Sequence, residues 1–174
     1  DEADISSVML NHNIEISHMS FSYDNKKVLD NITCLIKENE MTAIVGPSGS
    51  GKTTLCNMIA RFWDVDEGQI LIGDENIKNY TISNLMSNIS MVFQNVYLFE
   101  DTIENNIKFG QPNASLEDVI TVSKKAQCHE FISKLPSGYK TVVGEGGASL
   151  SGGEKQRISI ARAMLKDAPI VIFD

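Results

Sequence analysis

The fold is decided by one stretch of the sequence, Gly46-Pro47-Ser48-Gly49-Ser50-Gly51-Lys52-Thr53-Thr54. This stretch fits the phosphate-loop pattern Gly-x-x-x-x-Gly-Lys-Ser/Thr at every fixed position. It follows a short apolar run, Met41 to Val45, which we expect to be a buried parallel strand. It also opens a helix expected from Lys52 to Phe62. The order strand, loop and helix is the context in which the pattern is specific.

The chemistry of this loop is that of a phosphate site. Its glycines let the backbone curl so that several N–H groups point at one anion. The positive N-terminal end of the following helix adds to the attraction. Lys52 supplies a point charge for the β- and γ-phosphates, and the Thr53 hydroxyl can ligate Mg²⁺. We therefore predict that all nine residues from Gly46 to Thr54 bind a nucleotide.

Two further stretches suit the same chemistry. The apolar run Ile170-Val171-Ile172-Phe173 ends in Asp174. In open α/β sheets ligands sit at the carboxyl ends of the strands, where a carboxylate can hold Mg²⁺. The second stretch is Leu150-Ser151-Gly152-Gly153-Glu154-Lys155-Gln156-Arg157, a Ser/Gly-rich start to a helix expected over 153–166. Such a helix start is a second candidate anion site, although it also suits an ordinary capped helix.

Composition and charge limit the kinds of molecule that the chain is expected to bind. The chain has 174 residues, which is enough for one domain, and 15 basic against 23 acidic residues, a formal charge of −8. This charge argues against nucleic acid as the main partner. No run approaches the roughly 20 apolar residues of a membrane-spanning helix. The three cysteines and three histidines have no zinc or disulfide spacing, so a metal role for them is not predicted.

The remaining pattern indicates an α/β core with a helical insert. A strand with a local irregularity after Ile16 is expected over 14–23, followed by a turn at Asp24-Asn25. Short helices are expected between Thr102 and Lys134, with 116–126 the clearest. Further strands are expected over 31–37, 69–72, 89–93 and 170–173, and a helical turn over 83–86.

The stretch 150–157, followed by Ala161-Arg162-Ala163, resembles the signature motif of ATP-binding cassette (ABC) proteins. Together with the phosphate loop and the strand before Asp174, the resemblance covers nearly the whole chain. It implies a P-loop NTPase core with a mainly parallel sheet, an N-terminal antiparallel β region and a helical signature subdomain. Residues 1–174 would form one domain, with a linker over 1–13, a helical subdomain over about 95–160, and its C-terminal part missing after Asp174.

The resemblance also assigns roles, with ATP and Mg²⁺ as the cofactors. Tyr23, which would otherwise be an ordinary strand aromatic, matches the residue that stacks on adenine. Gln94 matches the glutamine directed toward Mg²⁺ and the attacking water. Lys52, Gln94 and Asp174 would be catalytic, and Thr53, Gln94 and Asp174 would hold the metal. Ser151, Gly152 and Gly153 match residues that reach the γ-phosphate bound to the opposite subunit, which implies a head-to-tail dimer with a second ABC domain, identical or different.

Two stretches look like the exporter-type subfamily, although each could be a plain surface loop. They are the x-loop-like segment Thr141–Gly147 and the segment Asn95–Ile107. Both would face the coupling helices of a transmembrane domain of the same transporter. The implied function is ATP hydrolysis that powers transport, at the cytoplasmic face of the cell membrane. Some siderophore importers share this architecture, so the resemblance is compatible with both export and import.

The chain departs from the family at its end. The glutamate that usually follows the Walker B aspartate, here Asp174, is absent, as are a later aspartate-bearing loop and a histidine. A chain of this length is therefore expected to bind Mg-ATP but to hydrolyse it very slowly, because such help with the water is worth about 10²–10⁴-fold. Family-typical turnover in a steady-state assay would contradict this.

Two other functions remain open at this point. A soluble ABC ATPase of translation or DNA maintenance is the main alternative. The DNA-repair type carries a long coiled coil between Gln94 and the signature, where this chain has only a compact segment. A nucleotide-binding regulatory module without turnover is the other.

Overall fold

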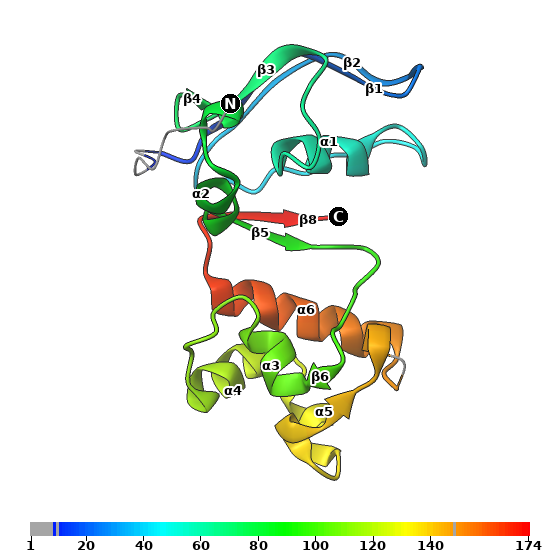
Figure 1. Ribbon diagram of the computed structural model, residues 1–174, viewed down its shortest axis with the longest axis vertical. Coiled ribbons are helices and arrows are strands. Elements are labelled where there is room, and N and C mark those ends of the chain that lie inside the picture. The colour runs from blue at the N-terminus through cyan, green and yellow to red at the C-terminus, as the bar shows by residue number, and fades with distance from the viewer. Residues whose placement is uncertain (1–8, 10, 148) are drawn as a thin grey trace. The chain divides into compact units, whose positions relative to one another are not determined.

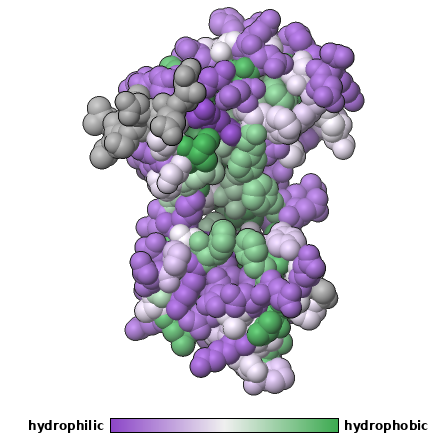
Figure 2. Space-filling view, in the orientation of Figure 1, coloured by the Kyte–Doolittle hydropathy of each residue, from purple (hydrophilic) through white to green (hydrophobic). Residues whose placement is uncertain are grey.

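The computed structural model describes residues 9, 11–147 and 149–174, and the chain forms two compact units, residues 1–89 and 90–174 (Figure 1). Most of the predicted linker over 1–13 lies outside the described residues. No helix in the described part of the chain has both the length and the apolar character needed to cross a bilayer. Hydrophilic side chains predominate on the face drawn in Figure 2.

The first unit contains an antiparallel sheet of order β2-β1-β3-β4. Its strands are β1 (Ile14–Tyr23), β2 (Lys26–Ile36), β3 (Glu67–Ile72) and β4 (Glu75–Asn76). The predicted turn at Asp24-Asn25 joins β1 to β2. The predicted irregularity in β1 is also confirmed, because its register against β2 shifts between Ile16 and Met19. The expected N-terminal antiparallel β region is therefore present.

The helical elements of the first unit are α1 (Lys52–Ile59), a 3-10 turn η1 (Ile77–Asn79) and α2 (Ile82–Ser87). The predicted strand at Met41–Val45 was wrong. This run has no strand assignment, and the side chains of Met41 and Val45 are 100% and 88% exposed. An apolar run becomes a strand only when a neighbouring strand accepts its backbone hydrogen bonds. None of the sheets among the described residues includes 41–45.

Among its described residues, the second unit combines short strands with four α-helices. The helices are α3 (Ile103–Lys108), α4 (Leu116–Lys125), α5 (His129–Lys134) and α6 (Gly152–Lys166), with 3-10 turns η2 (Gly138–Lys140) and η3 (Glu145–Gly147). The strands are β5 (Ile89–Val92), β6 (Asp101–Thr102), β7 (Val142–Val143) and β8 (Ile170–Phe173). β5 pairs with β8 and β6 with β7. Figure 1 shows β5 and β8 side by side, with both arrows pointing the same way.

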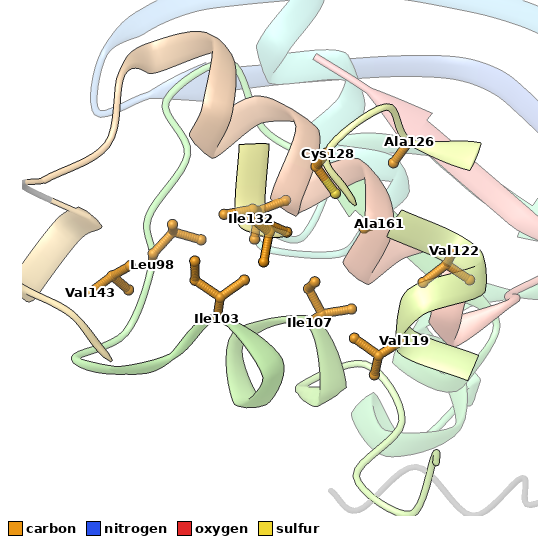
Figure 3. Close-up of a cluster of buried hydrophobic side chains, with 11 residues drawn as sticks. Leu98, Ile103, Ile107, Val119, Val122, Ala126, Cys128, Ile132, Val143 and Ala161 are labelled. Atoms are coloured by element: carbon orange, nitrogen blue, oxygen red, sulfur yellow. The ribbon is translucent and has the colours of Figure 1, made fainter. Parts of the chain in front are cut away.

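One hydrophobic core holds the helices of the second unit together (Figure 3). The core takes side chains from α3, α4, α5, α6 and β7, so these elements share one buried interior. Its residues are Leu98, Ile103, Ile107, Val119, Val122, Ala126, Cys128, Ile132, Val143, Ile158 and Ala161. Helix α6 therefore packs on α3 and α4 and belongs to the same core.

The close packing of α6 gives a stability prediction at Gly110, two residues after α3. A Cβ at this position would lie 2.8 Å from the carbonyl oxygen of Arg162 and 3.0 Å from the Cβ of Lys166. Overpacking of this kind typically costs about 1–3 kcal/mol. We expect Gly110→Ala to lower the free energy of unfolding by that amount in urea denaturation. Gly152→Ala is the control, because no atom lies within 4 Å of its added Cβ. Equal stability of the two variants would contradict the prediction.

Candidate nucleotide-binding site

The phosphate loop turns directly into α1. The backbone N–H of Ser50 donates to the Pro47 carbonyl oxygen at 3.2 Å, and that of Leu55 donates to Gly51 at 2.8 Å. Gly51 has a φ of +89°, and a Cβ there would meet the Val28 carbonyl oxygen at 3.2 Å and the Leu29 side chain at 2.8 Å. Only glycine suits both the left-handed backbone and the close approach to β2. The second fixed glycine of the pattern is thus explained by geometry.

Lys52 folds back over the loop that precedes it. Its Nζ donates to the carbonyl oxygens of Gly46 at 3.1 Å and Pro47 at 2.8 Å. Its positive charge is therefore held at the loop together with the N-terminal end of α1, which favours an anion. In the first turn of α1, Thr53 is exposed whereas Thr54 is buried. The predicted metal ligand is thus the threonine that reaches solvent.

Tyr23 lies in the same unit as the phosphate loop. It ends β1 and pairs with Lys26 of β2, and Val28, two residues further along β2, lies against Gly51. Two residues of strand span about 7 Å, so β2 connects Tyr23 to the loop over a short distance. The Tyr23 ring is half-buried and packs edge-on against Phe21, with centroids 4.8 Å apart.

In the second unit, Ser151 caps α6. The Ser151 Oγ accepts from the backbone N–H of Glu154 at 3.4 Å, and the Glu154 carboxylate accepts from the Ser151 backbone N–H at 2.8 Å and hydroxyl at 2.7 Å. This is a reciprocal capping box. The hydrogen bond from the Ser151 hydroxyl lowers the pKa of the Glu154 carboxyl. Gly152 and Gly153 are exposed, and no atom would lie within 4 Å of an added Cβ at either position. The helix start is therefore open to solvent.

Gln94 and Asp174 follow the paired strands β5 and β8. The backbone N–H of Asp174 donates to the Val92 carbonyl oxygen at 3.0 Å, so the two strands end at the same edge. Gln94 lies two residues beyond Val92 and is exposed, and Asp174 is partly buried. The structure thus brings together two groups of predicted residues, Tyr23 with the phosphate loop in one unit and Gln94 with Asp174 in the other. Their union in one site remains a prediction.

The two exporter-like segments pair with each other, which the sequence did not reveal. Thr102 pairs with Val142 in the β6–β7 ladder, and the Gly146 backbone N–H donates to Leu98 at 3.0 Å. The Ile103 backbone N–H also donates to Thr141 at 3.0 Å. Segments 95–107 and 141–147 therefore form one continuous piece of the second unit. Strands of two residues leave no alternation in the sequence from which they could be predicted.

Sequence reasoning also missed Asn106 and Arg162. Arg162 of α6 donates from Nε to the Asn106 carbonyl oxygen at 2.8 Å, and its guanidinium lies 5.8 Å from the Phe99 ring centroid and 5.7 Å from that of Phe109. The available signal was a polar residue between Ile103 and Ile107 on the apolar side of α3. Asn106 is 1% exposed, so its amide had to find partners inside the protein.

Comparisons with known proteins agree on one family. The family model described as "ABC transporter" matches residues 29–174. The "ATP-dependent lipid A-core flippase" of Syntrophus aciditrophicus (strain SB) is 50% identical over 165 residues, which cover 95% of this chain and 28% of that protein. The "Putative multidrug export ATP-binding/permease protein YgaD" of Bacillus subtilis (strain 168) is 45% identical over 163 residues, covering 92% and 28%.

A solved structure is similar as well. The chain in "Structure of a bacterial Atm1-family ABC exporter with ATP bound" superposes with a TM-score of 0.94 at 39% identity, covering 99% of this chain and 31% of that chain. The present chain thus spans about 28% of the length of the curated relatives it matches.

Proposed function

The chain belongs to the ABC transporter family, and on this premise we propose that it is the ATP-binding and ATP-hydrolysing domain of an exporter-type transporter. ATP-driven head-to-tail dimerisation of two such domains would power substrate movement across a membrane. One observation carries the proposal. Among the described residues, helix α1 begins at the phosphate loop and helix α6 begins at the signature, and both helix starts include exposed residues. The backbone N–H groups of the first turn of a helix have no partner within the helix ladder and favour an anion at that end.

The proposed ligands are ATP and Mg²⁺. The backbone from Gly46 to Thr54 and the Lys52 ammonium would bind the phosphates, and Tyr23 would stack on the base. Thr53, Gln94 and Asp174 offer a hydroxyl, an amide oxygen and a carboxylate, which are the hard oxygen donors that Mg²⁺ prefers. Bound Mg²⁺ would supply neutralisation of the phosphate charge. Ser151, Gly152 and Gly153 would contact the γ-phosphate held by a second ABC domain.

We propose that residues 1–174 form a single ABC domain with a mainly parallel sheet and a helical subdomain over about 95–160. Support comes from α3, α4 and α5, which lie within that range and share one core with α6. The other proposed partner is a transmembrane domain of the same transporter, which places this chain at the cytoplasmic face of the membrane. The exporter names of the relatives favour this function over a soluble ATPase of translation or DNA maintenance.

Paired capping-box variants test the proposed role of the signature. Ser115 caps α4 with a box like that of Ser151, because its Oγ accepts from the Asp118 backbone N–H at 3.1 Å. Removing either hydroxyl by substitution with alanine costs about 1 kcal/mol of stability. We expect Ser151→Ala to lower ATP turnover of the full-length transporter at least about tenfold, because it also removes a γ-phosphate contact. Turnover is measured by steady-state phosphate release.

Ser115→Ala is the matched control, with the same loss of stability and turnover within about twofold of the wild type, since Ser115 is an exposed cap of a helix that carries none of the proposed nucleotide-binding residues. Equal losses of turnover in the two variants would show that Ser151 acts only through the stability of its helix.

A further inference from the structure

Three aromatic rings meet at the end of β1, and the proposed nucleotide site uses only one of them. The ring of Trp63 lies 5.6 Å from that of Tyr23, centroid to centroid, at an interplanar angle of 89°. Phe21 lies 4.8 Å from Tyr23 and 6.2 Å from Trp63. Perpendicular packing at these distances is favourable for aromatic pairs. Tyr23 is therefore held by one buried ring, Phe21, and one partly exposed ring, Trp63.

Hydrogen bonds to β1 fix the segment that carries Trp63. The Asp66 carboxylate accepts from the Ser22 backbone N–H at 2.8 Å. The Asp66 backbone N–H donates to the Ser20 carbonyl oxygen at 3.1 Å. Both partners lie within three residues of Tyr23, so the segment is attached to the same part of β1 that presents the tyrosine.

Arg61 fixes the other end of this segment. Its guanidinium donates from one NH group to the carbonyl oxygens of Ile77 at 3.0 Å and Tyr80 at 2.9 Å, and its Nε donates to Asp64 at 3.3 Å. The backbone of Arg61 is left-handed, with a φ of 55°, which turns the chain sharply after α1. Hydrogen bonds from Arg61 and to Asp66 therefore hold the chain on both the N-terminal and the C-terminal side of Trp63.

Trp63 follows the helix that begins at the phosphate loop. Helix α1 begins at Lys52 behind the phosphate loop and ends at Ile59, four residues before Trp63. The Trp63 ring packs edge-on against Tyr23 and so limits the orientations open to the Tyr23 ring, while 52% of Trp63 remains exposed. We propose that Trp63 is a positioning residue that holds the Tyr23 ring in the orientation that stacks on the purine base. This inference rests on the proposed ATP-binding function.

The experiment compares ligands with and without a base. Binding of ATP and of inorganic tripolyphosphate to the full-length protein is measured for Trp63→Ala, Trp63→Phe and Leu35→Ala. Leu35 is the matched control, because it is an apolar side chain of the same unit that is 56% exposed on β2. We expect Trp63→Ala to raise the Kd for ATP about three- to tenfold and to leave the Kd for tripolyphosphate within twofold. Trp63→Phe, which keeps a ring, restores most of the ATP affinity, and Leu35→Ala changes neither constant.

A double variant shows whether Trp63 acts through Tyr23. If it does, Tyr23→Ala combined with Trp63→Ala binds ATP no more weakly than Tyr23→Ala alone. Additive losses, equal losses for the two ligands, or an unchanged Kd for ATP in Trp63→Ala would each overturn the inference. None of these results would affect the proposed function. A wild-type protein that binds neither ATP nor tripolyphosphate would instead refute the proposed function and the inference with it.

Discussion

Replacing Lys52 by alanine is expected to lower ATP turnover at least about 100-fold in the full-length transporter. Lys52 is the positive side chain held at the phosphate loop, where its Nζ donates to Gly46 and Pro47. A preorganised charge or donor aimed at developing negative charge is typically worth 10²–10³-fold in rate. In the proposed site the variant would lose this charge beside the γ-phosphate, where negative charge accumulates during phosphoryl transfer. Steady-state phosphate release at saturating Mg-ATP measures the effect.

Lys37→Ala is the matched control for charge. Lys37 is an exposed lysine of the same unit and follows β2 directly, outside the phosphate loop. It should retain turnover within about twofold, since a solvated surface charge contributes little. Comparable losses in both variants would indicate a general dependence on net charge and would contradict the role assigned to Lys52.

The largest expected effect on stability comes from Asn106→Ala. The Asn106 side-chain oxygen accepts from the Phe99 backbone N–H at 2.9 Å and from Arg162 at 3.2 Å, and its amide donates to Phe99 and Thr102 at 3.0 Å each. Alanine removes these side-chain hydrogen bonds in a site where Asn106 is 1% exposed, and the Phe99 backbone N–H loses its Asn106 acceptor. Each unsatisfied buried group costs about 1–3 kcal/mol. We expect a loss of about 3 kcal/mol, measured by urea denaturation.

The charge of Arg162 adds to this cost. Burial already lowers the pKa of its guanidinium, and Asn106 is one of its hydrogen-bond partners. Asn105→Ala is the neighbouring control, because Asn105 is exposed and its side-chain amide donates to the exposed Asp101 carboxylate at 2.9 Å. This control should lose less than about 1 kcal/mol. A loss below 1 kcal/mol in Asn106→Ala would mean that water replaces its amide.

Much of the local structure follows from periodicity and turn chemistry. β1 occupies the predicted residues 14–23, and α4 ends within one residue of its predicted end. Both patterns are local, since strand alternation and helical periodicity are contained within the element itself. The run Met41–Val45 shows the limit of this reasoning. Its composition suits a buried strand, but whether a run forms a strand depends on a hydrogen-bonded neighbour that the run itself does not encode.

The candidate site likewise has parts that the sequence predicted and parts that it did not. Motifs in the sequence predicted the phosphate loop and the helix start at Ser151, and both lie at the start of a helix that the sequence also predicts. The edge shared by Gln94 and Asp174 comes from the pairing of β5 with β8, which the sequence did not predict. Trp63 and Arg162 were not predicted as contacts. Trp63 lies 40 residues from Tyr23, and Arg162 lies 56 residues from Asn106. No local pattern records such long-range contacts.

The continuity of α6 has a mechanical consequence. A helix of 15 residues is a stiff rod about 22 Å long. The signature lies at the first turn of α6, and Arg162 lies near its last turn. There Arg162 donates to Asn106 and lies beside the Phe99 and Phe109 rings. A helix with no internal break has no hinge in which to absorb a displacement. We therefore expect a displacement of Ser151 along the helix axis to shift the Arg162 end of α6, and with it the contacts to Phe99 and Phe109.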